Sequence, residues 1–262
     1  MGRSRFRRCC FYYFNRRPTL LAQSANQLLD AFGSGRASPG SGSAAAMMGL
    51  LAVKLICTVC LKSLEKESCR SAEATLRHIR DRMVEIDPLL RVLFEKDARE
   101  FEEVIRLIGE RESATTPEAK GALSRQINAM LEGATDNVFE IIDLCLPLID
   151  HGVTVFKNGW GTVRGDSGAA ISSAIAAVTS GLFIANLNIK WLKGRRYARD
   201  NIGRGTALLT TLQQKQLAAN ACITSLNSEA LASIEVEATD DRQLPLELDD
   251  NVSAAPASGE SP

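Results

Sequence analysis

The chain has 262 residues, and its 31 basic and 31 acidic side chains give a formal net charge of zero. This length suits one ordinary domain or two small ones. A neutral body offers no broad positive surface, so we expect no nucleic-acid partner. Seven cysteines are too few for a disulfide scaffold. With two histidines in the whole chain, we also expect no metal site.

The two ends of the chain carry opposite charge. Residues 1–29 hold six arginines and no acid, whereas residues 235–262 hold eight acids and the single base Arg242. We expect residues 1–19 to be a basic disordered extension, residues 235–262 an acidic disordered tail, and residues 20–234 the helical domain between them. The start lacks the apolar core and cleavage site of a secretory signal, which favours a cytoplasmic protein. An organelle transit peptide and an extension upstream of the functional start are the two alternatives for this segment.

Helical periodicity recurs along nearly the whole chain, and the alternation typical of strands is absent. A first helix is predicted over Leu20–Phe32, before the glycines at 33 and 35, and a second over about Ser43–Leu64. A third runs over about Ser71–Ile108, where Pro88 kinks or splits it because proline cannot donate the interior hydrogen bond. Residues 109–116 are then expected to form a loop.

Three more helices complete the prediction. The fourth covers about Pro117–Phe156, with a second kink at Pro147, and is followed by a loop over residues 157–165. The fifth begins at Asp166 as its N-cap and ends near residue 193. The sixth covers about Thr206–Ile234, after a turn-rich connection over residues 194–205. The sequence therefore predicts an all-α fold, an antiparallel bundle of five to six helices, some of them long and kinked.

Two segments are apolar enough to resemble membrane spans. Ser43–Leu61 is apolar except for Lys54, and Gly168–Ile189 carries no charge. Both approach the roughly 20 residues that cross a bilayer. Both are rich in alanine, serine and glycine, however, and small residues permit close helix packing in a soluble bundle. We therefore expect core helices and no membrane contact, with a small membrane protein as the alternative.

Asp97 is the ionisable member of an apolar helical face. Leucine, phenylalanine, valine and isoleucine recur around it at steps of three and four between residues 90 and 108. A carboxylate on such a face has to be paired, hydrogen-bonded or protonated, because burying it bare is costly. Its pKa would then rise towards a range useful for proton transfer. The alternative is an edge position, where Asp97 pairs with Lys96 or Arg99.

Asp166 and the turn at residues 38–43 are two further candidates. Asp166 follows a glycine-rich loop, so it either caps a helix or projects into a cleft. The turn Ser38-Pro39-Gly40-Ser41-Gly42-Ser43 opens a long helix, whose first N–H groups can receive an anion or a polar ligand edge. Many helix starts look like this one, and the spacing is not that of a P-loop.

The spacing of Cys57 and Cys60 is that of a C-x-x-C motif. The pair lies inside an apolar helical run, with no second cysteine pair or histidine nearby to complete a zinc set. We interpret both residues as buried free thiols.

Four ordered blocks together resemble the cyclodeaminase/cyclohydrolase family, over about Ala25–Tyr197. They are the proline- and glycine-rich turn with the alanines that follow it, an aspartate followed four residues later by phenylalanine, an aspartate at a helix start, and an asparagine-containing stretch. The blocks are Ser38–Ala45, Glu95–Phe101, Gly165–Ala170 and Asn186–Ile189.

The resemblance implies an all-α subunit that forms a homodimer and binds a tetrahydrofolate derivative as its substrate. The family's reactions are closure of 5-formiminotetrahydrofolate with release of ammonia, and addition of water to the methenyl form. Both move protons around one carbon, which suits carboxylates and amides rather than a metal. The resemblance assigns proton transfer to Asp97 or Asp166, and orientation of the reacting nitrogen or water to Asn188.

The same resemblance implies a set of substrate-binding residues. The turn would hold the folate, and Arg36 or Lys62 would pair with its glutamyl carboxylates. The full set is Arg36, Ser38, Pro39, Gly40, Gly42, Ser43 and Lys62.

The sequence departs from the family pattern at a few positions. Ser41 and Ile184 replace a usual glycine and a usual asparagine, Leu61 and Lys62 occupy a region that usually carries an asparagine, and a usual proline near residues 135–137 is missing. These departures motivate the alternative of a non-catalytic relative that binds folate or a partner protein.

Overall fold

The computed structural model describes residues 19–237. The predicted disorder of the extension lies outside the described residues, as does that of the tail from residue 238 onward. The elements in chain order are η1 (Leu20–Ala22), α1 (Ala25–Gly33), α2 (Ser41–Leu64), η2 (Glu67–Ala72), α3 (Glu73–Ser113), α4 (Pro117–Asn158), η3 (Gly161–Val163), α5 (Arg164–Trp191) and α6 (Arg196–Glu237).

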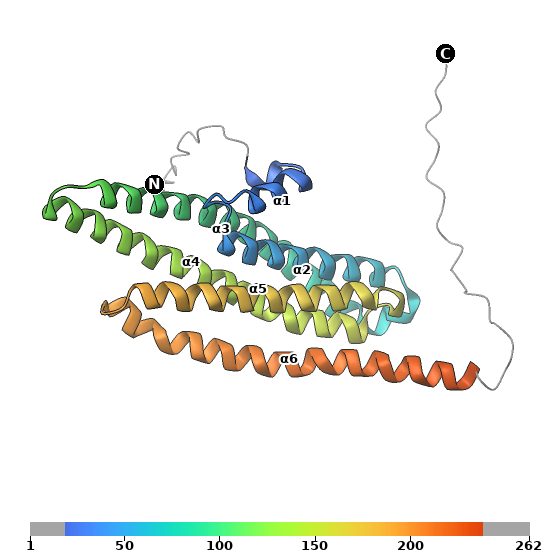
Figure 1. Ribbon diagram of the computed structural model, residues 1–262. Coiled ribbons are helices and arrows are strands. Elements are labelled where there is room, and N and C mark those ends of the chain that lie inside the picture. Colours follow the sequence, from blue (N-terminus) through green and yellow to red (C-terminus); the bar gives the residue numbers. More distant parts are fainter. Residues whose placement is uncertain (1–18, 238–262) are drawn as a thin grey trace, which may run out of the picture. The chain divides into compact units, whose positions relative to one another are not determined.

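The all-α prediction is confirmed for the described part of the chain, which forms six α-helices and three short 3₁₀ helices and no strand. Helices α2, α3, α4 and α5 pack lengthwise against one another and form the bundle (Figure 1). Helices α4 and α5 are antiparallel, since Gly152 packs on Ile171 while Gly181 packs on Ile142. Their buried leucine, isoleucine, valine and alanine side chains build one continuous core.

Local signals explain several helix boundaries. Ser24 and Gln27 form a capping box at the start of α1, so the predicted first helix divides into η1 and a shorter α1. Thr116 caps α4 from its side chain, and Pro117 occupies the first turn as predicted. Pro88 and Pro147 both lie inside helices that continue through them. The third helix is therefore not split, and it extends five residues beyond the predicted end.

The prediction that Asp166 is an N-cap is wrong. The segment before α5 is not an open loop, because η3 leads directly into the helix. Helix α5 therefore begins at Arg164 with Val163 as its N-cap, and Asp166 lies in the first turn.

The connection before α6 is also shorter than predicted. Gly194 has a φ of 84°, in the left-handed region that glycine reaches without strain, and the chain turns there. Helix α6 begins at Arg196, ten residues before the predicted start, and its helical residues reach Glu237, inside the predicted tail.

Polar pairs hold the first part of α6 to α4. The Tyr197 hydroxyl donates to Asp136 (2.6 Å), Arg204 pairs with Asp143 (2.6 Å), and Lys215 pairs with Asp150. The three aspartates are spaced seven residues apart on α4, so they share one side of that helix. The pairs of Tyr197 and Arg204 stabilise residues that the sequence pattern alone assigned to a loop.

The chain divides into two compact units, residues 1–222 and 223–262. The described part of the second unit is the end of α6, whose side chains are exposed from Ile223 to Ile234.

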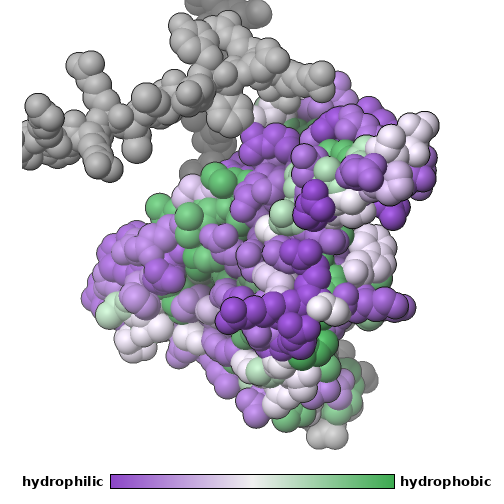
Figure 2. Space-filling view, turned by 90° about the vertical axis from the view of Figure 1, so that its left-hand side faces the viewer, coloured by the Kyte–Doolittle hydropathy of each residue, from purple (hydrophilic) through white to green (hydrophobic). Residues whose placement is uncertain are grey.

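Two stretches, Ser41–Leu64 and Gly161–Trp191, are long and apolar enough to cross a membrane by length and composition. About half of each apolar window, 50% and 44%, is buried against other helices. This burial supports the interpretation of α2 and α5 as core helices. Seen from the left-hand side of Figure 1, hydrophilic residues form most of the visible surface, with hydrophobic residues in smaller groups between them (Figure 2).

Candidate functional site

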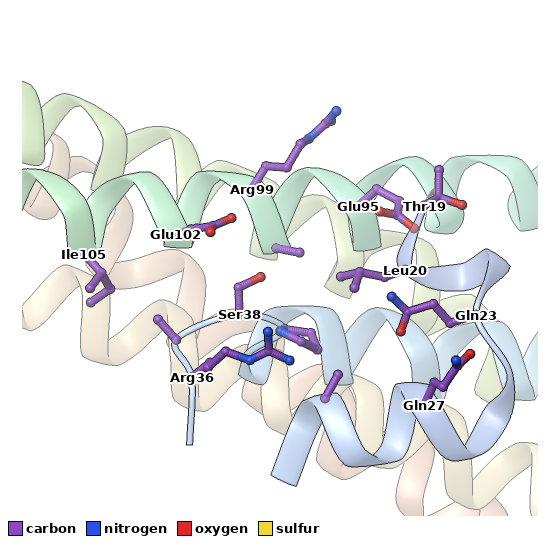
Figure 3. Close-up of a pocket in the computed structure, with 14 residues that line it drawn as sticks. Thr19, Leu20, Gln23, Gln27, Arg36, Ser38, Glu95, Arg99, Glu102 and Ile105 are labelled. Atoms are coloured by element: carbon purple, nitrogen blue, oxygen red, sulfur yellow. The ribbon is translucent and has the colours of Figure 1, made fainter. Parts of the chain in front are cut away.

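A pocket of about 790 Å³ lies between α1, the segment after α1 and one face of α3 (Figure 3). This volume is within the usual range of small-molecule sites. Its lining residues are Thr19, Leu20, Gln23, Gln27, Ala31, Arg36, Ala37, Ser38, Pro39, Glu95, Ala98, Arg99, Glu102 and Ile105.

Three of the predicted substrate-binding residues, Arg36, Ser38 and Pro39, line this pocket. Gly40 follows directly as the N-cap of α2. A Cβ added to Gly40 would lie 3.7 Å from the ring of Phe101, so the two residues are neighbours. Gly42 and Ser43 continue into the first turn of α2 and are buried. The predicted turn therefore begins in the pocket wall and ends in the interior.

Asp97 lies against the start of α2. Its Oδ2 accepts a hydrogen bond of 2.8 Å from the Ser43 hydroxyl, and the side chain is 8% exposed. A Cβ on Gly42 would lie 2.0 Å from Asp97 Oδ1, so only glycine leaves room for the carboxylate here. The alternative in which Asp97 pairs at an edge with Lys96 or Arg99 is not what the structure contains. Asp97 is a buried carboxyl group at a helix N-terminus, next to the pocket residue Ala98.

Two carboxyl groups near the pocket have raised pKa values. Burial raises the pKa of Asp97, and the Ser43 hydroxyl and backbone N–H, which favour the charged form, offset part of that rise. Burial also raises the pKa of Glu100, with Lys96 opposing this effect and Asp97 adding to it. A raised pKa brings a carboxyl group closer to the range in which it can both accept and release a proton.

Asn188 lies at the same end of the bundle as Asp97. Because α4 and α5 are antiparallel with Gly181 on Ile142, Asn188 falls two turns further along α5, level with Thr135. Asn137, two residues after Thr135 on α4, donates from Nδ2 to the carbonyl oxygen of Leu93, one turn before Asp97 (3.4 Å). Asn188 itself is 8% exposed.

Asp166 and Lys62 lie at the other end of α2. The Ser63 hydroxyl accepts from the N–H of Trp160 (2.8 Å), which places the start of α5 beside the end of α2. Ser63 is 20 residues from Ser43 along α2, a rise of about 30 Å. Within one subunit the structure therefore does not bring Asp166 or Lys62 together with Asp97.

Sequence reasoning missed the α3 wall of the pocket and a buried amide. Glu95, Ala98, Glu102 and Ile105 follow one another at steps of three and four on the side of α3 next to Asp97. The same periodicity that singled out Asp97 could have identified them. Asn137 is 1% exposed, and its Oδ1 has no hydrogen-bond partner among the described residues. No sequence signal indicated its burial.

The two cysteines of the C-x-x-C motif are free thiols in α2. Burial raises the pKa of Cys60 to about 12, which makes it a poor nucleophile and a poor metal ligand. Among residues 19–237, no group of three or more potential ligands could hold a metal ion.

The all-helical bundle of this chain is a fold that also occurs in solved structures. The fold is similar to that of formiminotetrahydrofolate cyclodeaminase from Thermotoga maritima, with a TM-score of 0.67 and 15% identity, over 79% of this chain and 98% of that one. Methenyltetrahydrofolate cyclohydrolase from Methylorubrum extorquens strain AM1 is 27% identical over 187 residues, 71% of this chain and 89% of its own.

The model of the formiminotransferase-cyclodeaminase family matches residues 24–203. The chain belongs to this family, and the resemblance seen in the four sequence blocks is confirmed.

Proposed function

We propose that this protein is a folate one-carbon enzyme, a cyclodeaminase or cyclohydrolase that acts on a tetrahydrofolate derivative in the cytoplasm. The observation that carries the proposal is the buried carboxyl group of Asp97 beside a pocket whose volume is usual for small-molecule sites, in a chain that belongs to the family. The relatives named for these two activities support the choice of substrate. Residues 20–234 form the enzyme domain in this proposal.

Asp97 serves as the proton-transfer group. In the hydrolytic reaction, its carboxylate takes a proton from water as the water oxygen bonds to the methenyl carbon. The carboxyl group then returns this proton to N5 as the bond from that carbon to N5 breaks, and the hydroxyl on the carbon loses its proton to solvent and becomes the formyl oxygen. In the deaminating reaction, N10 bonds to the formimino carbon and its proton passes to the formimino nitrogen. The protonated carboxyl donates a second proton to that nitrogen, whose bond to the carbon then breaks as it leaves as ammonia. The raised pKa of Asp97 favours the protonated form that this second role needs. Asn188 orients the reacting nitrogen or the water.

The entrance to α2 holds the substrate. Arg36, Ser38 and Pro39 contact it in the pocket, and Gly40, Gly42 and Ser43 shape the helix start behind them. The guanidinium of Arg36 pairs with glutamyl carboxylates, a charge-assisted contact that is stronger than a neutral hydrogen bond.

The active unit is a homodimer whose second copy supplies Asp166 and Lys62 to this site. Neighbouring helices α2 and α5 expose a set of apolar side chains that we name the α2–α5 face: Met47, Leu51, Leu61, Phe183 and Leu187. A two-fold axis across this face would place the end of α2 of one copy beside the start of α2 of the other. The arrangement explains why two predicted site residues lie about 30 Å from the rest within one subunit.

Purified protein incubated with methenyltetrahydrofolate, or with 5-formiminotetrahydrofolate, tests the proposal directly. We expect the near-ultraviolet absorbance of the methenyl form to fall faster than in buffer, or ammonia to be released from the formimino substrate. The enzyme assignment would be contradicted if the absorbance of methenyltetrahydrofolate fell only at the rate seen in buffer and no ammonia were released from 5-formiminotetrahydrofolate.

A further inference from the structure

One carboxylate of the pocket has no role in the chemistry above. Glu102 lies on α3, two turns beyond Glu95, and both line the pocket. Seven residues along a helix correspond to about 10 Å, so the two residues lie about that far apart along the α3 wall of the pocket. In Figure 3 Glu102 lies on the wall opposite the segment that carries Ser38, whereas Arg99 points away from that segment.

The other acids near the pocket already have partners. Glu95 accepts from the N–H of Leu21 (3.0 Å) and so anchors η1 to α3. Asp97 is hydrogen-bonded to Ser43. Glu100 lies 3.8 Å from Lys96 through Oε1, while its buried Oε2 has no hydrogen-bond partner among the described residues.

Glu102 differs from these acids. Within residues 19–237 no hydrogen bond or ion pair involves its carboxylate, and the side chain is exposed. Arg106, one turn further on, pairs with Glu103 and Glu110 instead. Glu102 therefore presents two acceptor oxygens to whatever enters the pocket.

A reduced pterin ring has the matching group. Its N3–H and its 2-amino group are adjacent donors that point the same way, as two N–H groups of a guanidinium do. An ionised carboxylate accepts both hydrogen bonds at once, as it does in a bidentate pair with arginine. A glutamine in its place offers one acceptor and one NH₂ donor, and the donor meets a donor of the pterin.

We propose that Glu102 recognises the pterin edge of the substrate and sets the specificity of the pocket for 2-amino pterins. This inference rests on the proposed folate chemistry and extends it to a residue outside the family-like blocks. Arg36 on the other wall carries the opposite charge, and its Nε is held by Ser34 (3.1 Å). The cationic Arg36 and the anionic Glu102 therefore lie on opposite walls of the pocket, where Arg36 attracts carboxylates of the ligand and Glu102 attracts its donor edge.

The test measures binding of two ligands by calorimetry: tetrahydrofolate, and the same molecule with a methyl group in place of the 2-amino group. The wild-type full chain is compared with Glu102→Gln and with Glu112→Gln, an exposed glutamate of α3 outside the pocket. Circular dichroism verifies that the variants are folded.

Wild type and Glu112→Gln are expected to prefer the 2-amino ligand by about 10- to 100-fold, the usual effect of hydrogen bonds to a charged group. Glu102→Gln should bind tetrahydrofolate weaker by a similar factor and lose most of the preference. An unchanged preference in Glu102→Gln overturns this inference while leaving the proposed function intact. Wild-type protein that binds neither ligand overturns both.

Discussion

The separation of Asp97 from Asp166 within one subunit leads to a quantitative prediction. About 30 Å of α2 lies between their positions, and an aspartate side chain reaches only a few ångströms, so no rotamer change could bring them into one site. If both act in one site, that site contains Asp97 of one copy and Asp166 of the other. Each single variant, Asp97→Asn or Asp166→Asn, then damages both sites of its own homodimer.

Mixing the two inactive variants should restore activity. In an equimolar mixture that has exchanged subunits, about half of the dimers are mixed. Each mixed dimer has one doubly substituted site and one intact site, so activity should return to about a quarter of wild type. Removing a general acid or base costs about 100-fold or more, so each variant alone should show about 1% or less. The assay is turnover of the methenyl or formimino substrate after exchange.

The control is a mixture of Asp97→Asn with the variant that carries both Asp97→Asn and Asp166→Asn. In this mixture every site of every dimer lacks Asp97. It should recover no activity. Subunit exchange is verified with a mass-tagged copy. A mixture of the two single variants that exchanges but stays at the level of each variant alone would refute the shared site, as would full activity of Asp166→Asn.

Three further predictions follow from the same region. Gly42→Ala should lower the free energy of unfolding by about 1–3 kcal/mol in a thermal melt, because its Cβ collides with Asp97, whereas Gly109→Ala, with open space around it, should not destabilise. Because the pKa of Asp97 is raised in the folded state, the free energy of unfolding of the wild type should fall as pH rises from about 4 through the folded-state pKa. Urea titrations over this pH range should show a smaller fall in the free energy of unfolding of Asp97→Asn. Phe183→Glu should yield a monomer by light scattering, whereas Leu217→Glu, equally exposed on α6, should remain dimeric; a dimeric Phe183→Glu would exclude the α2–α5 face as the interface.

Periodicity predicted the fold well where one face of a helix is apolar and a breaker ends the pattern. Helix α2 ends at Leu64 as predicted, and α4 begins at Pro117 as predicted. The prediction was wrong at the start of α6, where Gly194 and Gly205 indicated a loop. Polar pairs with α4 stabilise that stretch, and local propensity contains no information about a partner on another helix.

The candidate site was predictable only in part for a similar reason. Asp97 was identified because it interrupts an apolar stripe, a pattern visible in one helix. Its contact with Ser43 joins residues 54 positions apart, and the close approach to Gly42 depends on how α2 and α3 pack. The distance between Asp97 and Asp166 depends on the direction of α5, which a sequence pattern does not give. Glu102 looks like any solvent-facing glutamate until the fold places the segment that carries Ser38 opposite it.

The polar pairs between α4 and α6 have a consequence for the order in which the helices of this molecule separate. Its three polar pairs repeat at Asp136, Asp143 and Asp150. Sliding α6 by one residue would break every pair at once, so these pairs set the alignment of this helix together with its buried Leu212, Ala219 and Cys222. The two ion pairs, Arg204–Asp143 and Lys215–Asp150, weaken as added ions screen them, while the apolar contacts among α2 to α5 do not. Concentrated salt should therefore loosen α6 first and leave the remaining helices assembled.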